Sequence, residues 1–101
     1  MLEKEIQKQI LDYLGIKKYF YWRNNTGAMP TMYKGRKGFV RFGDVGSPDI
    51  FLVREGRIYG LEVKTPKGKQ SDTQIRWQRG FESEGGSYHV VRSLREVMNI
   101  F

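Results

Sequence analysis

Residues 47 to 64 read SPDIFLVREGRIYGLEVK, two apolar runs on either side of a Glu-Gly pair. This pattern is typical of a β-hairpin with a two-residue turn, so we predict that Arg54 lies opposite Arg57. Continued to the ends of the hairpin, this register places Asp49 opposite Glu62 on one face of the sheet. Opposed side chains have Cβ atoms about 4.5 to 5.5 Å apart, and like charges at that distance destabilise a sheet. The two carboxylates therefore need a shared proton, a cationic partner or a metal ion.

A third charged residue, Lys64, follows Glu62 by two positions and projects from the same face. Clustered carboxylate oxygens favour a hard divalent cation, Mg²⁺ or Mn²⁺, over zinc, which takes His or Cys ligands. The lysine would balance negative charge, or orient and deprotonate a water molecule. This arrangement suits metal-assisted hydrolysis of a phosphodiester. The alternative is that Asp49 merely ends a strand and that Glu62 and Lys64 form an exposed ion pair at a sheet edge. A three-residue turn would also break the register.

The part of the chain before this hairpin predicts a helix, a strand and a long connection. Residues 2 to 14 place their apolar side chains on one side of a helix that ends at Gly15. The aromatic run KYFYWR, residues 18 to 23, is β-like; its rings are expected to be core, with stacking of one ring on an unpaired base as the alternative. From 27 to 47 the chain is Gly-rich and basic, with only a hint of strand in GFVRF. We expect a long loop there, which is uncommon in a small domain unless it is functional.

The part after the hairpin predicts a helix, a strand and a short helix. Ser71 and Gln74 form an S-x-x-Q capping box, and Ser93 and Glu96 form a second box before the last helix. Between them SYHVVR reads as a buried strand whose histidine, His89, is expected to pack rather than to act as a base. The order of elements predicts an α/β fold, a small mixed β-sheet flanked by α-helices, in a single domain over residues 1–101.

Composition narrows the class of protein. The chain of 101 residues has 18 Lys and Arg against 11 Asp and Glu, a formal charge of +7, and no cysteine. Disulfides, a zinc ribbon and a thiolate nucleophile are therefore excluded, and no apolar run approaches the roughly 20 residues of a membrane span. We expect a soluble, cytoplasmic protein with no membrane partner, and the basic charge favours a nucleic-acid partner. Phosphate contacts are expected from basic residues of the two Gly-punctuated loops: Lys34, Arg36, Lys37, Arg41, Lys67 and Lys69.

The charged residues also match a known signature. Proline and aspartate before an apolar strand, then E-x-K at the end of the next, is the pattern of the PD-(D/E)XK nuclease superfamily, here Pro48, Asp49, Glu62, Val63 and Lys64. Further segments match along the chain: ExxIQ in the first helix, RNNTG after the first strand, G-x-PD, LEVKTPKG, a glutamine in the next helix and VVRS. Together these resemble the VRR-NUC family, the virus-type replication-repair nucleases, in its short stand-alone form, over nearly the whole chain.

The resemblance implies a restriction-endonuclease-like core and a bacterial or phage-encoded endonuclease dependent on Mg²⁺ or Mn²⁺, without an organic cofactor. It implies cleavage of branched DNA such as Holliday junctions by a homodimer. Carried over by position, the metal ligands would be Asp49, Glu62 and the carbonyl of Val63, with Lys64 as the catalytic lysine. Glu3 would supply the helix-borne acid, since it borders the apolar face while Glu5 points away.

Three further residues are implied less specifically. Gln74 would lie near the scissile phosphate, a role compatible with its capping box. Arg23 and Asn25, in RNNTG, match a segment beside the active site, although an ordinary surface turn explains them equally well. Two other functions stay open: a flap, linear-DNA or RNA nuclease with the same site, and a non-catalytic nucleic-acid-binding module. A binding module has no need of the acids, which favours the nuclease.

Overall fold

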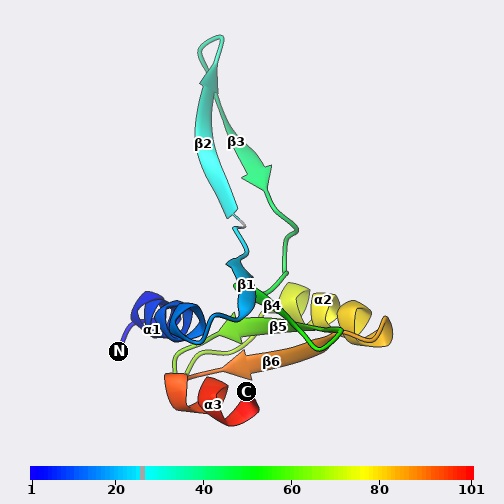
Figure 1. Cartoon of the computed structure of the whole chain (residues 1–101). Helices are drawn as coiled ribbons and strands as arrows, with labels where there is room; N and C mark the ends of the chain where they lie inside the picture. Colours follow the sequence, from blue (N-terminus) through cyan, green and yellow to red (C-terminus); the bar gives the residue numbers. More distant parts are fainter. Residues whose placement is uncertain (26) are drawn as a thin grey trace.

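The computed structural model describes residues 1–25 and 27–101 (Figure 1). Its elements are α1 (Glu3–Ile16), β1 (Phe20–Arg23), β2 (Gly27–Tyr33), β3 (Arg36–Phe42), β4 (Ile50–Arg54), β5 (Arg57–Val63), α2 (Asp72–Ser83), β6 (Ser87–Val91) and α3 (Leu94–Ile100). Strands β1, β4, β5 and β6 form one sheet in that order, with β5 and β6 parallel and the other pairs antiparallel. The predicted α/β fold, a small mixed sheet flanked by helices, is confirmed.

The two faces of this sheet carry different residues because side chains alternate along each strand. One face bears the core, in which Leu52 and Leu61 are fully buried among residues of α1 and α3. The other face bears an aromatic cluster: Phe51 of β4 lies 5.9 Å from Trp77 and 6.1 Å from Phe81 of α2, between ring centroids. Helix α2 has no fully buried residue. The α1 and α3 face therefore supplies most of the buried apolar area.

The central hairpin has the predicted register. Arg54 pairs with Arg57 and Ile50 pairs with Leu61. Glu55 and Gly56 both have positive φ, 52° and 78°, which is the backbone of a type I′ turn. A β-carbon is tolerated at the first position only with strain, and glycine relieves that strain at the second.

The region predicted as a long loop is instead a second hairpin, and that prediction was wrong. Strands β2 and β3 pair antiparallel through a Lys34-Gly35 turn and form a separate two-stranded sheet. We call this hairpin the arm. Figure 1 shows it projecting away from the main sheet, and the molecule measures 50 Å along its longest axis. Residues on both of its faces are exposed, so neither face shows the alternation that signals a half-buried strand.

The first helix, the aromatic run and His89 lie close to their predicted structures, with small differences. The first helix runs two residues further than predicted, to Ile16. In the aromatic run, Tyr19 and Tyr21 pack against the core, whereas Phe20 is 69% exposed, because successive residues of β1 point to opposite faces. His89 is half-buried and stacks on Tyr59, as expected of a packing residue, and burial lowers its pKa.

The predicted capping box is complete at the start of α2 and only half formed at the start of α3. Ser71 and Gln74 form the complete box at the start of α2. At α3, Ser93 Oγ accepts from the Glu96 amide, but the Glu96 carboxylate accepts from the amide of Arg92 rather than of Ser93. Over residues 1–25 and 27–101, no helix combines the length and the apolar character that crossing a bilayer requires.

Candidate active site

Three carboxylates from separate elements meet in one cluster. Glu3 stands at the start of α1, Asp49 directly precedes β4, and Glu62 is the second-last residue of β5. One oxygen of each lies within 4.8 Å of the others. Glu3 is exposed, Asp49 is half-buried and Glu62 is only 2% exposed, so the cluster opens to solvent on the side of α1. The structure thus brings together the three acids that the sequence singled out, and Glu5 is not among them.

Asp49 is held by two hydrogen bonds that continue the pairing of the sheet past the end of β4. Its Oδ2 accepts from the amide of Val63 at 2.7 Å, and its carbonyl accepts from the amide of Asn24 at 2.7 Å. The side chain therefore substitutes for a strand partner. This contact fixes the carboxylate against the end of β5, next to Glu62.

Glu62 is the most perturbed group of the cluster. Burial, and after it the adjacent Asp49 carboxylate, raises the pKa of Glu62 to about 9, against the opposing charge of Lys64. Its Oε1 is buried and, within the described part of the chain, has no hydrogen-bond partner. Buried polar atoms are nearly always paired, so an unpaired oxygen between two other carboxylates fits a cation. Three carboxylates are a donor set for a hard divalent ion.

Lys64 and Val63 lie where β5 ends. The Lys64 amide donates to the carbonyl of Val91 at 3.0 Å, which extends the pairing of β5 with β6. Its side chain is half-buried, and its charge acts on Glu62. Val63 is fully buried, and its backbone amide donates a hydrogen bond to Asp49 Oδ2. Its carbonyl as a metal ligand and Lys64 as the catalytic lysine stay predictions.

Gln74 lies at the start of α2, in the capping box. Its Oε1 accepts from the Ser71 amide at 2.9 Å, and its own amide donates to Ser71 Oγ at 3.2 Å. The side-chain oxygen is thus occupied at the helix end, which leaves the Nε2 donor for any contact with a phosphate.

A second glutamine, which sequence reasoning missed, lies on the same side. Gln70 Nε2 donates to Gln78 Oε1 at 2.9 Å and to the hydroxyl of Tyr88 at 3.3 Å. Burial, and after it the charge of Glu62, raises the pKa of Tyr88 to about 12, so this network lies within electrostatic range of the acids. No local sequence signal separates Gln70 from the other polar residues of its loop.

Among the described residues of RNNTG, Asn24 makes the side-chain hydrogen bonds, whereas the sequence singled out Arg23 and Asn25. Asn24 Nδ2 donates to Ser47 Oγ at 2.7 Å and to the carbonyl of Pro48 at 2.8 Å. Asn25 is exposed. Counting the strand alternation one residue past β1 places Asn24 opposite Asp49, but that register depends on β4 and was not predictable locally.

Replacing Asn24 by alanine is expected to destabilise the protein by about 1 to 3 kcal/mol, because it leaves part-buried acceptors on Ser47 and Pro48 unpaired. Urea denaturation monitored by circular dichroism measures this difference. The matched control is Asn25→Ala, an exposed neighbour expected to stay within about 0.5 kcal/mol of the wild type. Equal effects of the two substitutions would contradict the assignment of Asn24 as the anchor of this loop.

The predicted nucleic-acid-binding residues fall into three places. Arg23 lines a groove of about 280 Å³ with residues of α1, among them Lys4 and Gln7, next to the helix that bears Glu3. Lys67 and Lys69 are exposed on the loop after β5. That loop is clamped by Arg92, whose Nη1 donates to the carbonyls of Thr65 and Gly68, each at 2.7 Å. The remaining four, Lys34, Arg36, Lys37 and Arg41, lie on the arm and not at the cluster.

Comparisons with known proteins bear on the fold. No family model and no curated protein matches the chain. A solved structure described as a VRR_NUC domain matches with a TM-score of 0.66 and 23% identity, over 97% of this chain and 91% of that one. The chain has the fold of a VRR-NUC domain. At this identity the comparison establishes the VRR-NUC fold, the one that the motif resemblance implied.

The VRR-NUC fold and the acidic cluster are independent observations, because they rest on different parts of the structure. The fold comes from the course of the whole backbone, and the cluster comes from three side chains on α1, β4 and β5. In this chain Asp49, Glu62 and Lys64 stand together at the end of the central hairpin that lies opposite its turn.

Proposed function

We propose that the protein is a divalent-metal-dependent endonuclease, a single nuclease domain over residues 1–101, that hydrolyses phosphodiester bonds in DNA. Its substrate is branched DNA such as Holliday junctions, and its active form is a homodimer. The observation that carries the proposal is the meeting of Glu3, Asp49 and Glu62 in one cluster beside Lys64. The VRR-NUC fold supports it.

The roles of the residues follow from their positions. Glu3, Asp49 and Glu62, with the carbonyl of Val63, would hold Mg²⁺ or Mn²⁺, and the bound ion would stabilise charge on the phosphate and lower the pKa of water. The buried carboxylate of Glu62 would give up its proton on binding the ion, because a ligand must be ionised. Lys64 would balance negative charge as an ammonium or, as a neutral amine, orient and deprotonate the attacking water.

Substrate contacts outside the cluster are assigned to Arg23 and to the exposed lysines of the loop after β5. Arg23 lies beside α1, and Lys67 and Lys69 project from the loop clamped by Arg92. Each lysine or arginine that neutralises a phosphate makes binding salt-dependent. Gln74 would offer Nε2 to a phosphate oxygen, and Asn25 would contact the backbone at the edge of the site.

The homodimer follows from the number of cuts. The structure describes one acidic cluster in the chain, and a four-way junction is resolved by cutting two strands. A two-fold symmetric pair places two such sites on two strands. The dimer therefore accounts for branched DNA as the substrate, whereas a flap or linear nuclease would need a single site.

A cleavage panel tests the proposal. Labelled four-way junction, flap, duplex and single strand are incubated with Mg²⁺, Mn²⁺ or EDTA, and light scattering gives the mass of the protein. We expect junction cleavage with either metal, none in EDTA, and the mass of two chains. Preferred cleavage of flap or linear DNA by a monomer would support the alternative nuclease. Salt-dependent binding without cleavage in any metal would show a binding module and overturn the proposed function.

A further inference from the structure

The arm exposes large apolar side chains on both of its faces. Cross-strand pairing puts Pro30 with Phe39 and Met32 with Lys37 on one face, and Met29 with Val40 on the other. Phe39 is 76% exposed and Met32 is 64% exposed. An isolated two-stranded hairpin is marginally stable in water, and exposed apolar patches of this kind mark interaction sites. Such a hairpin is expected to gain stability from a partner that covers one of its faces.

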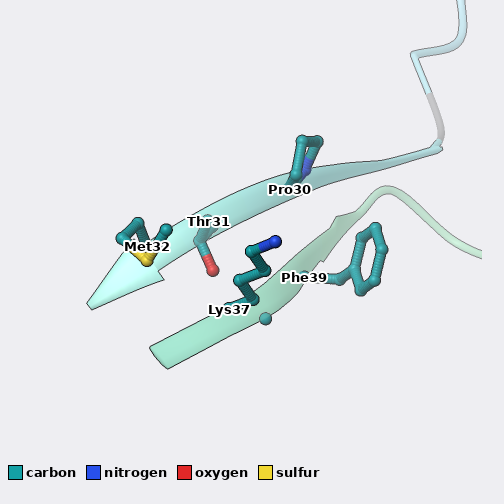
Figure 2. A pocket seen from close by; sticks show the side chains of 6 residues that line it. Pro30, Thr31, Met32, Lys37 and Phe39 are labelled. Carbon is teal, nitrogen blue, oxygen red and sulfur yellow. The ribbon is translucent and has the colours of Figure 1, made fainter. Parts of the chain in front are cut away.

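The Phe39 face is hollowed into a groove of about 480 Å³. Figure 2 shows Phe39 and Pro30 toward one end of it, Met32 toward the other, and the amino group of Lys37 between them. Thr31 and Gly38 complete the lining. The groove thus combines an exposed aromatic ring, a flexible thioether and a cation, the groups that bind a base and its phosphate in single-stranded nucleic acid.

Charge identifies the partner of the arm. Residues 27 to 43 contain four basic residues, Lys34, Arg36, Lys37 and Arg41, and no acidic residue. A second copy of the arm would bring like charges together, which costs free energy, whereas an anionic polymer is attracted along the whole ribbon. A nucleic acid fits both the charge and the exposed ring.

We propose that the arm is a DNA-reading element whose groove holds an unpaired base of the substrate. The base stacks on Phe39 and contacts Met32, and Lys37 pairs with the adjoining phosphate. The inference takes its ligand, DNA, from the proposed function and assigns to the arm the recognition of the branch. Bases stay paired and stacked along a continuous duplex and are freed where the strands part at a branch point, so the groove distinguishes branched from continuous DNA.

The position of the arm relates the branch to the cut. Asn24 precedes the arm in the chain and Ser47 follows it, and the two side chains are hydrogen-bonded to each other next to Asp49. A seven-residue strand spans about 23 Å, which corresponds to roughly seven nucleotides of a DNA strand. The groove lies part-way along this length. An unpaired base held there fixes the scissile phosphate a few nucleotides away from the branch.

Substitutions at Phe39 test the inference by binding, without metal. Phe39→Ile keeps an apolar, strand-compatible side chain but removes the ring, and Phe39→Tyr keeps the ring. A forked duplex with 2-aminopurine in its unpaired strand and an intact duplex of equal length are titrated in EDTA. We expect Phe39→Ile to weaken fork binding about tenfold and to lose the quenching of 2-aminopurine, with duplex binding within about twofold. Phe39→Tyr should match the wild type.

The matched control is Met29→Ala, which removes another exposed apolar side chain, 55% exposed, from the opposite face and should bind both DNAs like the wild type. Equal weakening of fork and duplex by Phe39→Ile, or no weakening, overturns the inference. So does a wild-type dimer that Phe39→Ile converts to monomers, because the groove would then hold a second chain. Cleavage by the wild type in Mg²⁺ is measured separately. If the wild type cuts DNA but Phe39→Ile binds the fork as tightly as the wild type does, only the role of the arm is contradicted. If Phe39→Ile selectively loses fork binding but the wild type cuts no DNA, only the proposed function is contradicted.

Discussion

Replacing Lys64 by alanine is expected to slow cleavage of a labelled four-way junction in Mg²⁺ by about 10² to 10³-fold, or more, while junction affinity stays within about twofold. In the proposed reaction the Lys64 ammonium would offset the charge that develops on the phosphate; the side chain is half-buried and its charge acts on the buried carboxylate of Glu62. Asp49→Ala is expected to abolish cleavage, because it removes a proposed metal ligand and the hydrogen bond from the Val63 amide. Single-turnover rates and binding in EDTA measure the two effects separately.

The control for this loss is Lys17→Ala, which removes the same charge at the other end of α1, about 20 Å from Glu3 along the helix. It should cut like the wild type. Lys64→Arg separates the two roles left to the lysine: arginine keeps the charge but does not release a proton near neutral pH. Retained cleavage by Lys64→Arg would assign charge balance, and lost cleavage would assign proton transfer. Undiminished cutting by both Lys64→Ala and Asp49→Ala would sink the proposed site.

Glu62→Gln is expected to abolish metal-dependent cleavage and yet to stabilise the metal-free protein by about 2 to 4 kcal/mol at neutral pH. Burial and Asp49 raise the pKa of Glu62 to about 9, from an ordinary value of 4.5. Between those two values the folded protein holds a proton that the unfolded chain has released. Wild-type stability therefore falls as pH rises through this window, and glutamine, which is neutral at every pH, removes the fall.

Urea denaturation in EDTA at about pH 5, 7 and 9 measures this effect. The gain from Glu62→Gln should be small near pH 5 and should grow toward pH 9. Added Mg²⁺ should then stabilise the wild type but not the variant, since the ion binds the folded state through Glu62. Glu5→Gln is the control, because its side chain is exposed and lies outside the cluster. If the variant is less stable than the wild type at every pH, the Glu62 carboxylate has a stabilising partner in the metal-free protein, and the expectation is wrong.

The parts of the site that were predictable from sequence are those set by local chemistry. The Glu55-Gly56 turn determines the register of the central hairpin, and the register places Asp49 beside Glu62. Glu3 was predictable because its place on the helical wheel borders the apolar face. Capping at Ser71 followed from a four-residue motif.

The remaining parts depend on contacts between distant segments. Asn24 rather than Asn25 anchors the site, because β1 pairs with β4 in a register that no local signal reveals. Arg92 clamps carbonyls 24 to 27 residues earlier in the chain. The arm escaped prediction for another reason: a strand exposed on both faces has no hydrophobic alternation to detect.

The two hairpins end in the same kind of turn, Lys34-Gly35 with φ of 50° and 76° and Glu55-Gly56 with φ of 52° and 78°. Their freedom to change length during evolution is nevertheless opposite. One residue inserted in the arm alters a projecting tip whose described strands form a sheet separate from the main one. One residue inserted after Glu55 shifts β5 so that Glu62 points into the layer of α1 and α3, where an acid has no partner. The length of the arm can therefore vary without disturbing the main sheet, while the second turn is held at two residues by the acids at the far end of its strands.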